Sequence, residues 1–256
     1  MQVPSLSFLG FLLVTLVLCL SVGRGSRQAG RKVLALAGVV FTVLGGGWRG
    51  FAVLAAGTAA TAAVLWCLER LDALPRRLAM AMGCLWHIAV LAVCKLTGWM
   101  PLGISFFTFQ QLWLLKETYT GQYRRSQGDS LLLYTFFFPT VTSGPILRPE
   151  EFFPQLREAF LCPSWGDAAA GLYAISFGMA KKVLLADPLG AVVSNGWALG
   201  QELTAPAAWI VILGYTLRLY LDFSGYCDIA SGCARLLGIR LPVNFDSPYR
   251  ALSVGE

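Results

Sequence analysis

The chain has 256 residues, of which 56% are hydrophobic and 13% are charged, and its formal net charge is +6. Because soluble domains carry about 25% charged residues, this composition excludes an ordinary soluble enzyme or nucleic-acid-binding module. The apolar runs lack the period-two alternation of barrel strands, and a helix is the other backbone that satisfies its own hydrogen bonds in lipid. We therefore predict an all-α, polytopic integral membrane protein, with residues 1–256 as a single membrane domain.

The N-terminal part, residues 1–100, is predicted to consist of transmembrane helices in which every second connecting loop is basic. Basic residues follow the first and third apolar runs and recur near residues 124–125. Since cytoplasmic loops carry an excess of Lys and Arg, this spacing predicts an outside N-terminus and cytoplasmic basic loops. The glycine-rich stretch GGGWRG is expected to form a turn between the second and third runs. The runs cover about residues 6–22, 33–44, 51–68 and 78–93.

Beyond Gly128 the pattern changes. The stretch LLLYTFFFPTVTSGPI is short for a membrane span and is interrupted by prolines and a glycine, which predicts a re-entrant segment that lines a cavity, because non-helical backbone at membrane depth needs protein or water around it. The next stretch, LRPEEFFPQLREAF, is typical of an interfacial helix. Two further helices are expected, one over about residues 168–186 that ends at DPLG and another that begins near Pro206.

Ionisable residues inside apolar runs are candidates for function. His87 is the only histidine, and because no second His or carboxylate stands three or four residues away, we favour a structural role satisfied by a neighbouring helix. For the adjacent Lys181 and Lys182 we favour snorkelling to the membrane interface, with contact to a phosphate or carboxylate as the alternative. No metal site is predicted.

The final part of the chain, YTLRLYLDFSGYCDIASGCARLLGIRLPVNFDSPYRALSVGE, places polar residues along one predicted helix. They form two stripes that face nearly opposite directions, about 160° apart at 100° per residue. We therefore expect either a helix enclosed by protein or, preferably, a break near Ser224–Gly225 with the polar half lining a cavity. An ion-paired packing helix without chemistry is the simpler alternative. The stripes are Tyr215, Arg218, Asp222 and Tyr226, in which Arg218 and Asp222 can pair, and Ser224, Asp228, Ser231 and Arg235.

Four motifs occur in order: PLGISFFTFQQ, FFPTVTSGPILRPEEFFPQL, GMAKKVLLADPL and YTLRLYLDFSGYCDIASGCARLLGIRLPVNFDSPY. Together they resemble the membrane-bound O-acyltransferase (MBOAT) superfamily, specifically its branch of alginate O-acetylation and teichoic acid D-alanyl transfer proteins. The resemblance covers about residues 101–256. Residues 1–100 are similar only as a set of membrane helices.

The resemblance implies a multi-pass enzyme of the bacterial inner membrane with a funnel through the bilayer. It would move an acyl group from a cytoplasmic thioester, acetyl-CoA or an acyl carrier, with no bound cofactor. O-acetylation of an exported polysaccharide such as alginate is the leading expectation, and D-alanyl transfer to teichoic acid is second. The implied partners are the lipid bilayer, periplasmic acyl-relay or polysaccharide-modifying proteins, and a polysaccharide acceptor, but not nucleic acid.

The family's essential histidines would lie beyond Glu256, and His87 stands in the wrong motif to replace them. The chain is therefore expected to be the N-terminal portion of such an enzyme, with no catalytic residue of its own and no activity alone. The residues expected to line the funnel are Asp222, Ser224, Tyr226, Asp228, Asn244 and Tyr249.

Two other classes of function suit the same residues. A transporter or flippase would use broken helices and intramembrane ion pairs, but no internal repeat supports it. A non-catalytic scaffold of a polysaccharide export complex is the other alternative.

Overall fold

The computed structural model describes residues 5–124, 130–158, 160–246, 248–251 and 253, and these residues form helices and turns without a strand. Among these residues, four helices are long and apolar enough to cross a membrane, and they cover Leu6–Gly25, Arg27–Arg70, Leu74–Thr97 and Trp165–Leu199. The predicted all-α, polytopic membrane fold is confirmed.

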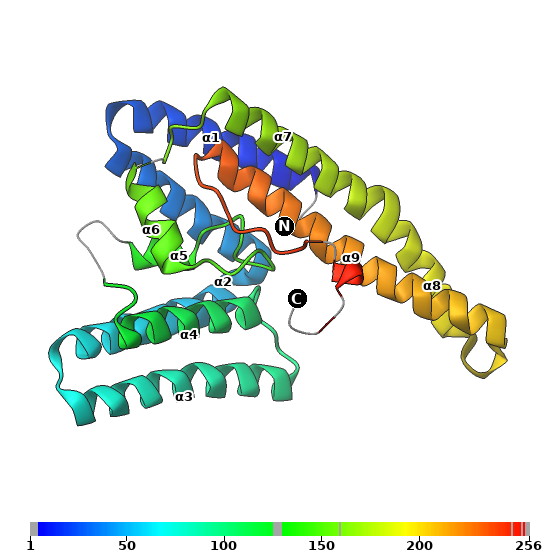
Figure 1. Ribbon diagram of the computed structural model, residues 1–256, viewed down its shortest axis with the longest axis horizontal. Helices are drawn as coiled ribbons and strands as arrows, with labels where there is room; N and C mark the ends of the chain where they lie inside the picture. The colour runs from blue at the N-terminus through cyan, green and yellow to red at the C-terminus, as the bar shows by residue number, and fades with distance from the viewer. Residues whose placement is uncertain (1–4, 125–129, 159, 247, 252, 254–256) are drawn as a thin grey trace.

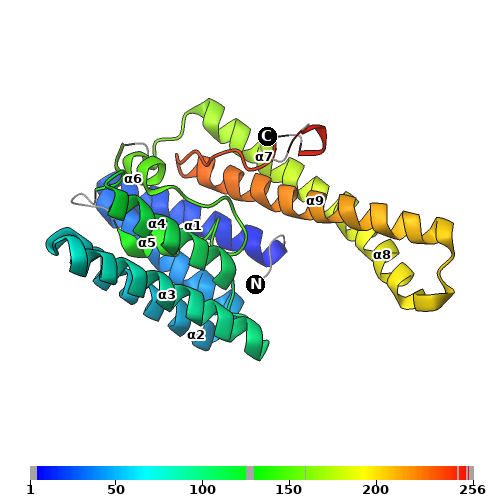
Figure 2. The same ribbon diagram turned by 60° about the horizontal axis from the view of Figure 1, so that its bottom comes forward.

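The helices follow one another in two groups. The first group is α1 (Leu6–Gly25), α2 (Arg27–Arg70), α3 (Ala73–Thr97), α4 (Ile104–Thr120), α5 (Leu131–Thr135) and α6 (Pro149–Glu158). The second is α7 (Trp165–Met179), the π-helical turn η1 (Ala180–Ala186), α8 (Asp187–Leu199) and α9 (Ala205–Leu236), with 3-10 turns η2 (Gly200–Glu202) and η3 (Pro248–Arg250). Figures 1 and 2 show the first group as a bundle, and α7, η1 and α8 lying along α9 as a long hairpin that extends beyond it.

The predicted glycine turn lies inside α2. Gly47 has φ 73° and ψ 167°, which are not helical angles, and the helix is kinked there. Figure 1 shows the chain changing direction sharply between the two parts of α2. Because a positive φ is readily available to glycine alone, Gly47 separates the two predicted apolar runs.

The helix predicted to end at DPLG continues instead through that stretch into α8. The N–H of Asp187 donates to the carbonyl of Lys182, five residues earlier, in the wide turn of a π-helix. Pro188 then lies in the first turn of α8, where a missing N–H is tolerated. The π-turn therefore carries the chain past a proline that would end a regular helix.

The predicted break at Ser224–Gly225 was wrong, because α9 is continuous there. A Cβ added to Gly225 would lie 2.8 Å from the carbonyl oxygen of Gly178, and one added to Gly232 would lie 2.5 Å from that of Gly171. Small residues of this kind let two membrane helices approach closely. The glycines of α9 thus form its contact with α7. Enclosure by protein was also wrong for the first stripe, because Leu217 and Leu219 beside it are 47% and 58% exposed.

Candidate functional site

A buried, non-helical loop occupies residues 136–148, between α5 and α6. A Cβ added to Gly38 in α2 would lie 1.7 Å from the carbonyl oxygen of Phe136, and one added to Gly103 would lie 1.9 Å from that of Val141. The backbone of two other elements therefore touches this loop directly. The predicted re-entrant segment is indeed irregular from Phe136 onward, and most of that part is buried.

Tyr134 and Gln110 hold the two ends of this loop. The side chain of Tyr134 is fully buried, and its hydroxyl donates to the carbonyl of Leu147 at 2.7 Å. Gln110 of α4 donates its side-chain amide to the carbonyl of Tyr134 at 2.8 Å. Buried polar backbone groups are costly without such partners, so these two side chains stabilise the irregular path of the loop.

Tyr226 connects α9 to the middle of the same loop. Its hydroxyl donates to the carbonyl of Pro139 at 3.2 Å and also shares a hydrogen bond with the hydroxyl of Thr142. The loop is therefore held by the bundle on one side and by the long hairpin on the other. The first predicted stripe of α9 thus contributes one contact with the loop.

The aspartates of α9 face the lysines of η1 instead. The distance from Lys181 Nζ to Asp228 Oδ2 is 2.7 Å, and Lys182 Nζ lies 2.6 Å from Asp222 Oδ1 and 3.0 Å from Asp187 Oδ1. Contact with carboxylates, the alternative given for these lysines, is what the structure shows, and their snorkelling to the membrane interface stays a prediction. A charge paired within a membrane helix hairpin costs less than an isolated one.

Asp222 does not pair with Arg218, as the spacing had suggested. No ion pair joins these two residues in the part of the chain that the structure describes, and the carboxylate of Asp222 contacts Lys182. The guanidinium of Arg218 packs on α8, where a Cβ added to Gly190 would lie 2.9 Å from Arg218 Nε. Lys182 of η1 thus pairs with Asp222 in place of Arg218, the partner predicted one turn away on the same helix.

The segment that follows α9 returns along this helix, as Figure 1 shows. Asn244 donates its side-chain amide to Cys227 Sγ at 3.3 Å, and the Tyr249 hydroxyl donates to the carbonyl of Thr216 at 3.0 Å. Between them, the ring of Phe245 packs edge-on against Phe223. Both predicted residues therefore do lie beside α9, on the stripe that holds Thr216, Phe223 and Cys227.

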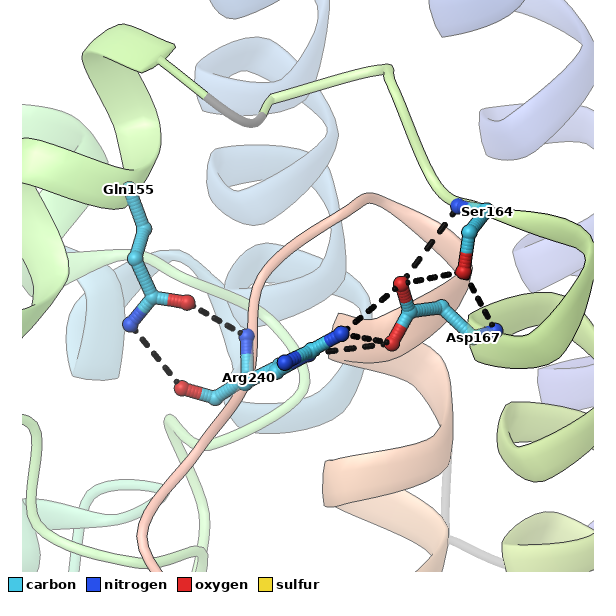
Figure 3. Close-up of polar contacts among 4 residues, drawn as sticks. All are labelled: Gln155, Ser164, Asp167 and Arg240. Carbon is cyan, nitrogen blue, oxygen red and sulfur yellow. Dashed lines mark hydrogen bonds and ion pairs between the residues drawn. The ribbon is translucent and has the colours of Figure 1, made fainter.

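Arg240 fixes the start of this returning segment, as shown in Figure 3. Its side chain donates to Asp167 of α7 through Nε at 3.0 Å and Nη2 at 3.2 Å. Its backbone N–H donates to Gln155 Oε1 at 2.8 Å, and its carbonyl accepts from Gln155 Nε2 at 3.1 Å. Asp167 also forms a capping box with Ser164. One residue therefore joins α6, the start of α7 and the returning segment.

Replacing Gln155 by alanine is expected to loosen the returning segment. The change removes both hydrogen bonds to the Arg240 backbone, each worth about 0.5–1.5 kcal/mol. Limited proteolysis of the purified chain should then cleave after residue 240 several times faster. The matched control is Gln28→Ala, because Gln28 is exposed and distant in sequence from this contact. Equal cleavage rates in the two variants would show that Gln155 does not hold the segment.

His87 and Ser224, two residues that the sequence analysis singled out, are both buried inside the protein. His87 is 2% exposed, and its Nε2 lies 2.9 Å from the Thr61 hydroxyl oxygen of α2, as expected for a histidine satisfied by a neighbouring helix. Ser224 is also 2% exposed, and its hydroxyl has no hydrogen-bond partner within the described ranges.

Apart from Ser224, the predicted residues therefore fall into three groups, and sequence reasoning missed other residues. Asp222 and Asp228 face η1, Tyr226 faces the buried loop, and Asn244 and Tyr249 border α9. The irregular loop itself was predicted, but no local pattern singled out the side chains that hold it, because these contacts join residues far apart in the sequence. The missed residues are Gln110, Tyr134, Pro139 and Thr142.

The sequence matches no protein-family model. It is 34% identical over 185 residues to a peptidoglycan O-acetyltransferase of Helicobacter pylori, a match that covers 61% of this chain and 35% of the relative. This chain is related to membrane-bound O-acyltransferases. It is also 34% identical over 158 residues to the probable alginate O-acetylase AlgI of Pseudomonas aeruginosa, covering 61% of this chain and 30% of that protein.

A more distant relative has a different acyl group in its name. The teichoic acid D-alanyltransferase of Bacillus subtilis is 29% identical over 164 residues, covering 60% of this chain and 40% of the relative. The chain thus spans between 30% and 40% of the length of these membrane-bound O-acyltransferase relatives. The resemblance inferred from the four motifs is confirmed.

Proposed function

We propose that this chain forms part of a membrane O-acyltransferase that modifies hydroxyl groups of a cell-surface polymer. The observation that carries this proposal is that relatives named for peptidoglycan, alginate and teichoic acid share one kind of reaction. Acetyl transfer to an exported polysaccharide such as alginate is the leading form, because the O-acetylating relatives are more similar than the D-alanyl-transferring ones. D-alanyl transfer to teichoic acid is the second form.

The chain's own residues would shape the route of the acyl group. In acyl transfer a hydroxyl oxygen attacks the thioester carbonyl, a base accepts the hydroxyl proton, and the thiol leaves. We assign Asp222, Asp228 and Tyr226 to the wall of that route, because they place polar groups along an otherwise apolar hairpin. Asn244 and Tyr249 support the same wall, and Ser224 offers a buried hydroxyl with no partner among the described residues.

The general base is expected from outside residues 1–256. His87, the one histidine of the chain, is buried and hydrogen-bonded to Thr61, which leaves its imidazole unavailable to a substrate. We therefore expect no acyl transfer by these residues alone.

The donor, the partners and the location follow from the same proposal. The donor would be a cytoplasmic acyl thioester, acetyl-CoA or an acyl carrier, and periplasmic relay or polysaccharide-modifying proteins would receive the group. The protein would lie in the bacterial inner membrane, with its basic loops in the cytoplasm by the positive-inside rule.

A chimera tests this proposal directly. The chain would be joined to the remaining C-terminal part of the Helicobacter pylori relative, and membranes would be supplied with radiolabelled acetyl-CoA and polymer. We expect alkali-labile acetate on the polymer from the chimera and none from residues 1–256 alone. The intact relative is the positive control.

Three outcomes of this experiment would count against the proposal. A folded chimera that transfers neither acetate nor D-alanine would overturn the assigned reaction. Turnover by residues 1–256 alone would refute the predicted need for another histidine. Unchanged turnover after replacing both Asp222 and Asp228 by asparagine would remove these residues from the wall.

A further inference from the structure

The long hairpin carries a cation, Arg218, that has no partner among the described residues. Its guanidinium lies over Gly190 of α8, where an added Cβ would be 2.9 Å from Nε and 3.1 Å from Cζ. The side chain is half-buried, and within the described ranges it forms neither a hydrogen bond nor an ion pair. A charged residue in a membrane helix is costly and normally has a polar partner. The absence of a side chain at Gly190 therefore leaves room for a guanidinium whose donors can bind a ligand.

Two carboxylates lie about one helical turn from this position. Asp222 is four residues after Arg218 on α9, and Asp187 is three residues before Gly190 on α8. Lys182 Nζ contacts only Oδ1 of each carboxylate, at 2.6 Å and 3.0 Å, and the two side chains are 45% and 54% exposed. Their Oδ2 atoms have no contact in the part of the chain that the structure describes. The hairpin thus offers a guanidinium and two carboxylate oxygens on neighbouring turns.

The net charge of this cluster favours a zwitterionic ligand. Lys182 and Arg218 are positive, whereas Asp187 and Asp222 are negative. A purely anionic ligand would neutralise Arg218 but would be repelled by the two carboxylates. A ligand with a phosphate and an ammonium group satisfies both, because a guanidinium binds phosphate through two parallel hydrogen bonds and carboxylate oxygens accept hydrogen bonds from an ammonium group.

The length of α9 sets the depth of the cluster in the membrane. Arg27, in the basic turn between α1 and α2, donates to Cys162 Sγ at 3.2 Å, just before α7. A Cβ added to Gly171 of α7 would lie 3.3 Å from Cβ of Arg235, so this end of the hairpin is beside a turn that the positive-inside rule predicts to be cytoplasmic. Arg218 lies about 26 Å from Arg235 at 1.5 Å per residue, and the hydrocarbon core is about 30 Å thick. We therefore expect Arg218 at the depth of the outer headgroups.

We propose that this cluster binds the headgroup of phosphatidylethanolamine from the outer leaflet. Arg218 would hold the phosphate, and Asp187 and Asp222 would accept hydrogen bonds from the ammonium group. The acyl chains would lie deeper along the hairpin, where Leu184 is 67% exposed. Phosphatidylcholine has the same phosphate but no N–H donor, so the site discriminates between these two lipids. This site does not depend on the proposed acyl transfer.

Native mass spectrometry of the detergent-solubilised full chain tests the proposal. Dioleoylphosphatidylethanolamine should bind more tightly than dioleoylphosphatidylcholine by about three-fold or more, the effect of one net hydrogen bond. Arg218→Gln should weaken phosphatidylethanolamine binding about five-fold, the factor expected for the loss of one exposed ion pair. Arg49→Gln is the matched control, because Arg49 is an exposed arginine beside the Gly47 kink, on the same expected side of the membrane. Equal weakening by the two changes would overturn the site.

A glycine pair tests the position of the guanidinium without changing any charge. Gly190→Ala should displace the guanidinium and weaken phosphatidylethanolamine binding by about two-fold or more. Gly214→Ala is its control on the same hairpin, because an added Cβ there would meet Val193 Cγ2 at 3.4 Å, an ordinary contact. If the two alanine variants bind the lipid equally well, the guanidinium over Gly190 does not hold the phosphate.

Three further measurements identify the ligand. Asp187→Asn leaves Lys182 paired with Asp222 and should lower the preference for phosphatidylethanolamine over phosphatidylcholine; an unchanged preference would contradict the ammonium contact. Tighter binding of dioleoylphosphatidylglycerol than of phosphatidylethanolamine would assign Arg218 to an anionic lipid and overturn the proposal. Excess soluble phosphoethanolamine should not displace the lipid, because it lacks acyl chains, and displacement would assign the cluster to a soluble zwitterion instead.

Discussion

Gly103→Ala is expected to prevent stable folding of the chain. Gly103 caps the start of α4 with φ 70°, and an added Cβ would lie 1.9 Å from the carbonyl oxygen of Val141 in the buried loop. The left-handed conformation costs about 1–2 kcal/mol, and overpacking of a well-packed site adds about 1–3 kcal/mol or more. The fraction recovered as a monodisperse peak by size-exclusion chromatography, and the melting temperature of that fraction, would measure the loss.

Gly121→Ala provides the matched control for this prediction. Gly121 caps the other end of α4 with φ 79°, and nothing lies within 4 Å of an added Cβ. This variant therefore carries the backbone strain without the collision, and it should lose only about 1–2 kcal/mol of stability. If Gly103→Ala and Gly121→Ala have the same melting temperature, the contact between Gly103 and the loop does not determine the fold of this region.

Lys182→Met is expected to destabilise the long hairpin strongly. The change removes the cation that lies between Asp187 and Asp222 and leaves two half-exposed carboxylates without a cation on a helical hairpin that we predict to lie in the membrane. An uncompensated charge inside a membrane costs about 2.5–3.5 kcal/mol. Reversible unfolding in detergent should show a loss of that order, with the helices of the hairpin affected first.

A double-mutant cycle identifies the ion pair as the cause. Asp222→Asn alone leaves Lys182 with Asp187, so it should cost less than Lys182→Met. The two changes together should lose less than the sum of the two single losses, with a coupling energy of about 0.5–3 kcal/mol. Arg148→Met is the control, because Arg148 and Glu151 lie outside the four helices that could cross a membrane, and such surface pairs contribute about 0–1 kcal/mol. Strict additivity of the Lys182 and Asp222 effects would contradict the pairing.

Much of the fold was predictable because it depends on local properties. The apolar runs, the glycine turn at Gly47, the start of α9 near Pro206 and the irregular loop around Pro139 all follow from composition or from the backbone preferences of proline and glycine. The structural role of His87 was also predictable, since no acidic or histidine partner stands one turn away.

Predictions about α9 failed where a single helix was considered without its neighbour. In the sequence of α9 alone, Ser224–Gly225 is a typical kink site, and Arg218 and Asp222 have the spacing of a helical ion pair. In the fold, Gly225 packs on Gly178, and Asp222 forms an ion pair with Lys182, which lies forty residues earlier in the chain. The end predicted at DPLG failed for another reason, because the π-turn before Asp187 accommodates the proline.

The sequence by itself determined that this is a helical membrane protein, how its basic loops alternate, and which acyltransferases it is related to, because these depend on composition and on ordered motifs. Only the tertiary structure decided which charges neutralise one another and which residues hold the buried loop. Those contacts join α4, α5, η1 and α9, and in an apolar environment a charge or a backbone carbonyl pairs with whichever polar group the packing of the helices places next to it.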